Sequence, residues 1–428
     1  MPKQLIQAPK GMHDILPQDQ QYWNVLRAAG EAVLRVYGFE RIDVPLVEAA
    51  ELFLRGVGAA TDLVEKQMYS FKTRGGDELT LRPEMTASVA RAYIEHGMHA
   101  LPQPIKLWYQ GPVFRHENPQ FGRYRQHWQL GAETLGEDAA VLDAEVIQAL
   151  YAIYTSMGLS DVMIQINSIG DAVCRPGYRK ALVNYYKSRR EDLCKDCKRR
   201  FTTNPLRLLD CKEPGCQELR DGAPQIVDYL CEKCHKHFRE VLEFLDEAGL
   251  PYILNAHLVR GLDYYTRTVF EFFMEGSELT PIGAIGGGGR YDELIELLGG
   301  KPTPAVGGVI GMDRVVDALR KREGALFRRT EAAPRVFLAQ LGDLGKKRSL
   351  KLFEELRRAG LSVAEAFSKD SLKVQLRIAN RLGVEWALIL GEKEAIDGSI
   401  IAREMTSGIQ ETLRLDQVVS EMKKRIKK

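Results

Sequence analysis

Residues 107–133 read LWYQGPVFRHENPQFGRYRQHWQLGAE and carry the chain's strongest strand-turn-strand pattern. The stretch begins as an apolar, aromatic run, which is typical of a buried strand. Asn118-Pro119 and Gly122 follow, and such residues mark a turn. A second run then leads away from the turn as far as Gly131. The stretch therefore predicts a long β-hairpin.

Charged and polar residues follow the spacing of a strand in the second half of this hairpin. Arg123, Arg125, Gln129 and Glu133 are separated by even numbers of positions, so a regular strand places them on one face, with Arg115 opposite. Guanidinium groups suit a polyphosphate, and an amide with a carboxylate suits a small ligand that carries an ammonium or an imidazole N–H. For an isolated hairpin, a solvated charged face is the alternative.

The hairpin resembles motif 2 of the class II aminoacyl-tRNA synthetases, in the form found in the histidyl-tRNA synthetase family. Four other segments resemble that family in the family's order: residues 80–86 (TLRPEMT), 258–273 (LVRGLDYYTRTVFEFF), 286–292 (GGGGRYD) and 306–314 (VGGVIGMDR), the last resembling motif 3. A helix predicted over residues 18–37, a strand over 40–44 and Pro45 resemble motif 1, which implies a homodimer. Five segments over most of the chain are far more specific than any one motif.

This resemblance implies an enzyme that activates L-histidine with ATP and Mg²⁺ and then transfers it to tRNA(His). Activation builds negative charge on the α-phosphate, and fixed cations stabilise it. By resemblance, Arg115 and Arg260 bind the α-phosphate and are catalytic, while Arg314 and Arg123 hold the rest of ATP. A structural salt bridge from Arg260 to Asp263 or Glu271 is the alternative role.

The resemblance also implies a pocket that reads the ammonium, carboxylate and imidazole of histidine. Its residues would be Glu84, Met85, Thr86, Arg115, Gln129, Glu133, Arg260, Tyr264 and Tyr265, with Tyr291 a looser candidate. Met85 stands where many relatives have glycine, and His127-Trp128 departs from the commoner Phe-His. The glycines at 286–289 and 307–308 would let substrates approach the strand backbones.

Changes of pattern along the chain divide it into domains. Residues 1–170 and 255–325 form the two parts of an α+β catalytic domain, which the resemblance implies is an antiparallel sheet with flanking helices. Residues 171–254 are helical, charged and cysteine-bearing, so we expect an inserted helical domain, which by resemblance reaches towards the tRNA acceptor stem. Residues 321–334 read as a linker. Residues 326–428 alternate strands and helices, among them a helix predicted over 372–382 and a strand over 386–390. This alternation predicts an α/β domain with a largely parallel sheet, and the segment resembles an anticodon-binding domain.

Bulk composition limits the possible classes of protein. The chain is 45% hydrophobic and 28% charged, with a net charge of +2, so tRNA binding would need local basic patches such as 187–190, 198–200, 346–348 and 423–428. No run is long enough to span a bilayer, and residues 1–14 lack the apolar region of a signal peptide, so we expect a cytoplasmic protein.

Seven cysteines raise the question of a metal site. Cys194-x2-Cys197 and Cys231-x2-Cys234 are paired CxxC motifs, which can together make a tetrahedral zinc site. The family resemblance implies no structural metal here, so we expect no stoichiometric zinc.

Two other functions share parts of the pattern. The synthetase-like regulatory subunit of ATP phosphoribosyltransferase has the catalytic fold but usually lacks the C-terminal domain and has a degraded histidine signature. An adenylating enzyme with a non-tRNA acceptor would leave residues 335–428 without a role. The intact 258–273 signature and the C-terminal domain favour the synthetase.

Overall fold

The computed structural model describes residues 5–58, 61–120, 122–274, 283–322 and 334–426. The chain divides into two compact units, residues 1–326 and 327–428. Most of the predicted linker lies outside the described residues. Among the described helices, none is long and apolar enough to cross a membrane.

The first unit is built on an eight-stranded sheet in the order β1-β5-β6-β11-β10-β9-β7-β8. The six inner strands pair antiparallel, while the edge strands β1 and β8 each pair parallel to their neighbour. The strand bounds are β1 Glu40–Arg41, β5 Ile105–Phe114, β6 Gln126–Leu135, β7 Val162–Ser168, β8 Tyr252–Leu254, β9 Thr266–Met274, β10 Gly286–Arg290 and β11 Ala305–Gly311. A separate three-stranded sheet has the order β2-β4-β3, with β2 Val47–Ala49, β3 Tyr69–Lys72 and β4 Glu78–Leu81.

Strands β5 and β6 confirm the predicted hairpin. They pair from Ile105 opposite Leu135 to Phe114 opposite Gln126. Because β6 begins at Gln126, Arg123 and Arg125 precede it, and the prediction that they share a strand face with Gln129 and Glu133 was wrong. The connection between the two strands is longer than the alternating pattern predicted, because it includes Arg123 and Arg125.

The glycines of β10 and β11 allow close packing inside the sheet. A Cβ on Gly288 would lie 2.0 Å from the carbonyl oxygen of Gly307, and one on Gly307 would lie 1.5 Å from Glu133 Oε2. Only glycine fits such positions without movement of the neighbouring strand. These glycines were predicted to leave room for substrates, but part of that room is filled by the neighbouring strand and by Glu133.

Helices cover the sheet of the first unit. The predicted helix over 18–37 is α1, which buries Tyr22, Trp23, Leu26 and Leu34. Helix α4 is apolar on most sides and packs against α1, β6 and β11. The bounds are α1 Gln20–Val36, α2 Ala50–Gly56, η1 Leu63–Gln67, α3 Thr86–Glu95, η2 Met98–Ala100, α4 Ala140–Ser156, α9 Leu294–Leu297 and α10 Met312–Lys321.

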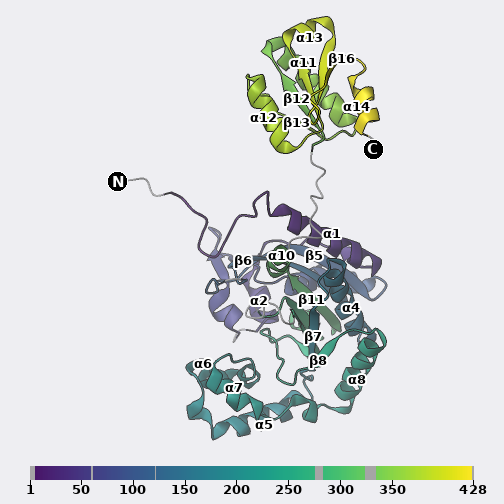
Figure 1. Ribbon diagram of the computed structural model, residues 1–428. Coiled ribbons are helices and arrows are strands. Elements are labelled where there is room, and N and C mark those ends of the chain that lie inside the picture. The colour runs from purple at the N-terminus through teal and green to yellow at the C-terminus, as the bar shows by residue number, and fades with distance from the viewer. Residues whose placement is uncertain (1–4, 59–60, 121, 275–282, 323–333, 427–428) are drawn as a thin grey trace. The chain divides into compact units, whose positions relative to one another are not determined.

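Helices form most of the segment between β7 and β8, as predicted, and α5, α6 and α7 gather at one end of the unit (Figure 1). Their bounds are α5 Arg175–Lys187, η3 Arg190–Asp192, α6 Lys195–Thr203, η4 Pro205–Leu208, α7 Pro214–Asp221, η5 Ile226–Tyr229 and α8 Glu232–Glu247. Residues 171–254 were predicted to be helical, but the last three of them form β8, which joins the main sheet beside β7.

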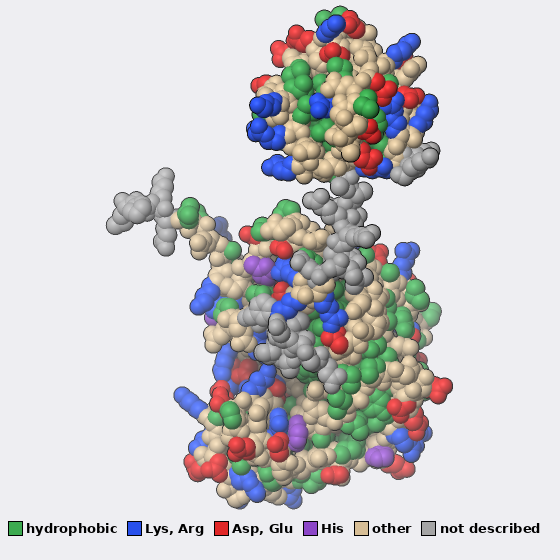
Figure 2. All heavy atoms as spheres, in the orientation of Figure 1, with side chains coloured by type: hydrophobic (Ala, Val, Ile, Leu, Met, Phe, Trp, Pro, Cys, Tyr) green, Lys and Arg blue, Asp and Glu red, His purple; other side chains and the backbone are tan. Residues whose placement is uncertain are grey.

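The second unit has a five-stranded sheet in the order β13-β12-β14-β15-β16. Strand β12 pairs parallel with β13 and β14, but β15 and β16 pair antiparallel, so the sheet is mixed rather than largely parallel. The bounds are β12 Val336–Gln340, α11 Gly342–Arg358, β13 Val363–Glu365, α12 Leu372–Leu382, β14 Trp386–Leu390, α13 Glu392–Asp397, β15 Ser399–Glu404, β16 Gln410–Arg414 and α14 Val418–Ile426. Acidic and basic side chains are interspersed over the visible face of each unit (Figure 2).

Candidate active site

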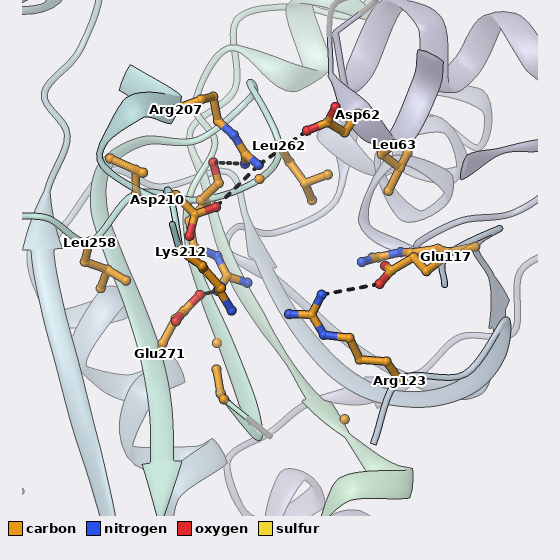
Figure 3. A pocket seen from close by; sticks show the side chains of 18 of the residues that line it. Asp62, Leu63, Glu117, Arg123, Arg207, Asp210, Lys212, Leu258, Leu262 and Glu271 are labelled. Carbon is orange, nitrogen blue, oxygen red and sulfur yellow. Dashed lines mark hydrogen bonds and ion pairs between the residues drawn. The ribbon is translucent and has the colours of Figure 1, made fainter. Parts of the chain in front are cut away.

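A cavity of about 930 Å³ opens in the first unit, between the β5–β6 hairpin, the glycine-rich strands and the insertion. Figure 3 shows Arg123 and Glu117 on one side of it, and Arg207, Asp210 and Lys212 on the other. Most of the predicted site residues line it, namely Glu84, Thr86, Arg115, Arg123, Gln129, Arg260, Tyr264, Tyr265 and Arg314. Met85 and Glu133 are absent from the described lining, and both are buried behind it.

Glu133 is held at the centre of a hydroxyl network behind the cavity. Thr86 Oγ1 and Tyr109 Oη each donate to its Oε1 at 2.8 Å. Tyr291 Oη donates to its Oε2 at 2.6 Å. Burial raises the pKa of Glu133 to about 7, although these three hydroxyls oppose the rise. The side chain therefore links β6 to α3, to β5 and to the residue that follows β10.

This raised pKa makes stability depend on pH in a defined direction. Between about 4.5 and about 7 the native carboxyl holds a proton that the unfolded chain has lost, so the free energy of unfolding falls as pH rises through that window. The shift corresponds to a loss on the order of 3 kcal/mol. We expect wild type to lose this amount relative to Glu133→Gln when denaturant unfolding is measured at pH 5 and at pH 7.5. Parallel pH profiles of the two proteins would contradict the assignment.

Glu84 lies at the beginning of α3 and faces the cavity. Its Oε2 accepts from the backbone N–H of Thr86 at 2.7 Å and its Oε1 from that of Ala87 at 3.0 Å. These two bonds satisfy N–H groups that a helix start leaves unpaired, and they fix the carboxylate. The carboxylate of Glu84 therefore caps the start of α3.

Another part of the lining combines an amide with aromatic rings. Gln129 Oε1 is buried and has no hydrogen-bond partner among the described residues, although its side chain lines the cavity. The rings of Tyr264 and Tyr265 lie 4.7 Å apart by centroid. An unpaired buried acceptor is costly, so a ligand that donates to Gln129 would remove that cost.

Several arginines line the cavity. Arg115 Nε donates to the carbonyl of Pro83 at 2.8 Å, and Arg314 Nε donates to that of Gly122 at 2.8 Å. Burial and the neighbouring Arg115 lower the pKa of His127 to about 3, so this imidazole stays neutral. Arg123 Nη1 lies 3.6 Å from Glu117 Oε2. An anion entering here meets several fixed cations at once.

Arg260 is held between a carboxylate and a ring. It forms an ion pair with Glu271, the partner considered in its alternative role, and its guanidinium lies 5.6 Å from the centroid of Tyr265. Its Nε is buried without a partner among the described residues. The side chain still lines the cavity, so the Glu271 contact fixes the cation at the wall rather than removing it.

Comparison with known proteins identifies the family. The family model of histidyl-tRNA synthetases matches residues 11–315, and that of an anticodon binding domain matches residues 336–425. A histidine–tRNA ligase of Dehalococcoides mccartyi (strain ATCC BAA-2266 / KCTC 15142 / 195) is 47% identical over 99% of this chain and 100% of its own length.

The chain belongs to the histidyl-tRNA synthetase family.

Other relatives agree with this membership. A histidine–tRNA ligase of Syntrophotalea carbinolica is 45% identical over 96% of each chain. The crystal structure of apo histidyl-tRNA synthetase from S. aureus superposes with a TM-score of 0.80 at 35% identity, covering 97% of this chain and 99% of that one. The chain is thus a class II aminoacyl-tRNA synthetase with a catalytic and an anticodon-binding part.

In this member of the histidyl-tRNA synthetase family, the insertion supplies one wall of the cavity, which sequence reasoning missed. Arg207 Nη1 donates to the carbonyl of Arg260 at 3.1 Å, and its Nη2 lies 3.4 Å from Asp210 Oδ2. Lys212 and Arg220 also line the cavity. These residues sit among many other charges in residues 187–221, so no spacing singled them out.

The predicted basic patch at 198–200 is largely neutralised by ion pairs. Lys198 pairs with Glu191, while Arg199 and Arg200 both reach Asp62. The ion pair between Asp62 and Arg200, at 2.8 Å, joins α6 to the segment before η1. These arginines attach the insertion to the catalytic part.

A buried ion pair behind the sheet was also missed. Arg290 Nη2 lies 2.8 Å from Asp143 Oδ2, and both side chains are fully buried. His237 of α8 reaches the same carboxylate at 3.2 Å. Removing one partner would leave an uncompensated buried charge, so this contact holds α4, α8 and β10 in fixed positions. The sequence offered only the pattern GGGGRYD, read there as substrate contact.

Proposed function

We propose that the cavity holds L-histidine and ATP side by side, so that the histidine carboxylate can attack the α-phosphate. The observation that carries the proposal is one cavity whose described lining holds both buried acceptors, namely Glu84, Thr86 and Gln129, and several arginines. The reaction is that of the family: histidine and ATP give histidyl-adenylate and diphosphate, and transfer to tRNA(His) releases AMP.

Histidine would lie against the buried acceptors of the lining. Its ammonium needs acceptors, and Glu84, Thr86 and Gln129 provide a carboxylate, a hydroxyl and an unpaired amide oxygen. Its imidazole would lie against Tyr264 and Tyr265, where hydroxyls can read the ring nitrogens. We propose that Glu133 sets the polarity of this floor through its bond from Thr86, and that buried Met85 shapes it by packing. Such a pocket rejects rings that lack the nitrogens, because its own polar groups would be left unpaired.

ATP would lie beside the histidine, with its phosphates among the arginines. Arg115 and Arg260 would face the α-phosphate, and Arg314 and Arg123 would hold the outer phosphates. The carbonyl bonds of Arg115 and Arg314 orient their guanidinium groups before ATP arrives. Charges fixed in advance need no reorganisation as the transition state forms.

Mg²⁺ would enter with ATP. Carboxylate oxygens are the protein ligands that Mg²⁺ prefers, and Glu117 and Glu271 both line the cavity beside arginines. The ion would offset phosphate charge as diphosphate leaves. Neither carboxylate is free, since each is paired with an arginine, so we expect them to hold Mg²⁺ only together with phosphate oxygens.

We further propose the division of labour and the setting implied by the family. Residues 1–170 and 255–325 carry activation, residues 171–254 approach the acceptor end of tRNA(His), and residues 326–428 bind its anticodon. The chain would form a homodimer through α1 and the edge strand β1, where Val36 is exposed. Its place would be the cytoplasm.

Glu133→Gln tests the histidine subsite. An amide presents an N–H to hydroxyls that now donate to a carboxylate, so Thr86 and Tyr291 would be displaced at the pocket floor. Hydrogen bonds to charged groups contribute about 1.5–3 kcal/mol, so histidine affinity should fall by about 10- to 100-fold while ATP affinity changes little. Calorimetric titration of each ligand measures both. Equal losses for histidine and ATP would indicate a general structural role instead.

A further inference from the structure

The insertion brings all seven cysteines of the chain into two clusters. The first contains Cys194, Cys197, Cys211 and Cys216, and the second contains Asp171, Cys174, Cys231 and Cys234. Within each cluster the candidate ligand atoms all lie within 4.8 Å of one another. The two CxxC motifs, which the sequence suggested as one ligand set, thus belong to different clusters.

We propose that each cluster binds one structural zinc ion, which reverses the expectation drawn from the sequence. Zinc takes four tetrahedral ligands with Zn–S distances of about 2.3 Å, so two sulfurs on one ion lie about 3.8 Å apart. Cys194 Sγ and Cys211 Sγ are 3.8 Å apart. Four protein ligands leave no open position for a substrate, so the ions hold structure and take no part in the reaction.

The backbone around the clusters suits thiolates. Cys216 Sγ accepts from the N–H of Cys194 at 3.3 Å, and Cys194 Sγ accepts from that of Cys197 at 3.4 Å. In the second cluster, Cys174 Sγ accepts from the N–H of Cys231 at 3.1 Å. Such donors stabilise negative sulfur, as do the nearby N-termini of helices.

Helix starts position most of the ligands. Cys194, Cys174 and Cys231 stand directly before α6, α5 and α8, and Cys197 and Cys234 lie in the first turns of α6 and α8. The first ion would join α6 to α7. The second would join the start of α5, where the insertion leaves the catalytic sheet, to the start of α8, the last helix of the insertion. Small helical segments with little core gain much of their folding free energy from such ions.

Disulfide bonds and ordinary core packing account for the two clusters less well than metal does. Disulfides need sulfurs about 2.05 Å apart in pairs, whereas the second cluster offers three thiols and the Asp171 carboxylate, which is a metal ligand and not a disulfide partner. Core packing suits buried cysteines but does not require their sulfurs to converge. Convergence of every cysteine in the chain on two points favours metal.

Metal analysis of the full chain, purified without a metal-affinity tag, tests the proposal. We expect about two zinc ions per chain by inductively coupled plasma mass spectrometry. Cys211→Ser and Cys234→Ser should each reduce the count to about one. Lys198→Ala and Lys233→Ala, which change neighbours of the ligands, should leave it at about two. One zinc that only Cys211→Ser removes would support the first site and overturn the second.

X-ray absorption on the wild-type chain needs no variant to fold. We expect seven sulfurs and one oxygen shared over two zinc ions, with Zn–S distances of about 2.3 Å. Zinc bound only by nitrogen and oxygen, iron in place of zinc, or no stoichiometric metal would overturn the proposal. None of these readouts depends on catalysis, so they leave the assignment of the active site independent.

Discussion

Replacement of Arg260 by alanine is expected to slow the formation of histidyl-adenylate by about 10²–10³-fold, the usual cost of losing one preorganised donor. The contact would strengthen as charge builds on the α-phosphate, so the Michaelis constants for histidine and ATP should change less than the rate does. The rate of histidine transfer from preformed adenylate to tRNA should also fall less than the rate of adenylate formation does. Single-turnover measurement separates the two steps.

The structure explains why Arg260 would be effective. Its guanidinium is fixed by the ion pair with Glu271 and by the ring of Tyr265, so little motion has to be arrested when ATP binds. The bond from Arg207 to its carbonyl fixes the backbone as well. A side chain already held at the cavity wall meets the condition for electrostatic stabilisation without reorganisation.

A matched control separates catalysis from stability. Arg199 also forms ion pairs, with Asp62 and Glu65, but is not among the described residues that line the cavity. We expect Arg199→Ala to leave the activation rate within a few-fold of wild type. If a folded Arg260→Ala protein did the same, Arg260 would be a structural partner of Glu271 and its assignment would fail.

A chain ending at residue 326 should retain activation and lose efficient charging of tRNA. The two units have separate hydrophobic cores. A core of the first unit includes Phe53, Tyr109 and Val269, and the two core clusters of the second unit include Leu338, Leu388 and Phe337. Every residue proposed for activation lies in the first unit. Tandem binding modules raise overall affinity by about 10²–10⁴, so charging at low tRNA concentration should fall by about 10² or more.

The comparison needs both assays on both proteins. Adenylate formation by the shortened chain should stay within about threefold of the full chain, and raising the tRNA concentration should recover part of the charging rate. Equal loss of both activities in a folded protein would show that the boundary or the division of labour is wrong.

Local sequence patterns predicted much of the fold, because the apolar spacing and the turn residues of many segments are enough to indicate their helices and strands. Helix α12 and strand β14 have the predicted bounds, and the hairpin of β5 and β6 follows from its apolar runs and its turn. Strand β8 escaped prediction because it is three residues long and is stabilised by pairing with distant β7. Strand β15 pairs antiparallel with β14 and with β16. These pairings depend on tertiary contacts, which the alternation of strands and helices along the sequence does not predict.

For the site, motif resemblance located most lining residues, but it could not say what else they contact. Glu133 has the expected place on β6, yet three hydroxyls from separate elements donate to its carboxylate behind the cavity. Arg207 and Lys212 were missed because only the folded insertion brings them to the wall. The cysteine clusters likewise form through contacts between helix ends. Spacing alone grouped the two CxxC motifs as one ligand set, whereas in the structure they belong to different clusters.

The most direct measurement of the central claim is amino-acid-dependent exchange of pyrophosphate into ATP by the purified full chain. A cavity that binds histidine beside the arginine-held phosphates predicts exchange with L-histidine and ATP in the presence of Mg²⁺, and none above background with phenylalanine, which lacks the ring nitrogens. Exchange that ignores the identity of the amino acid, or no exchange with histidine in a folded and metal-analysed preparation, would contradict the assignment of this cavity as the site of histidine activation.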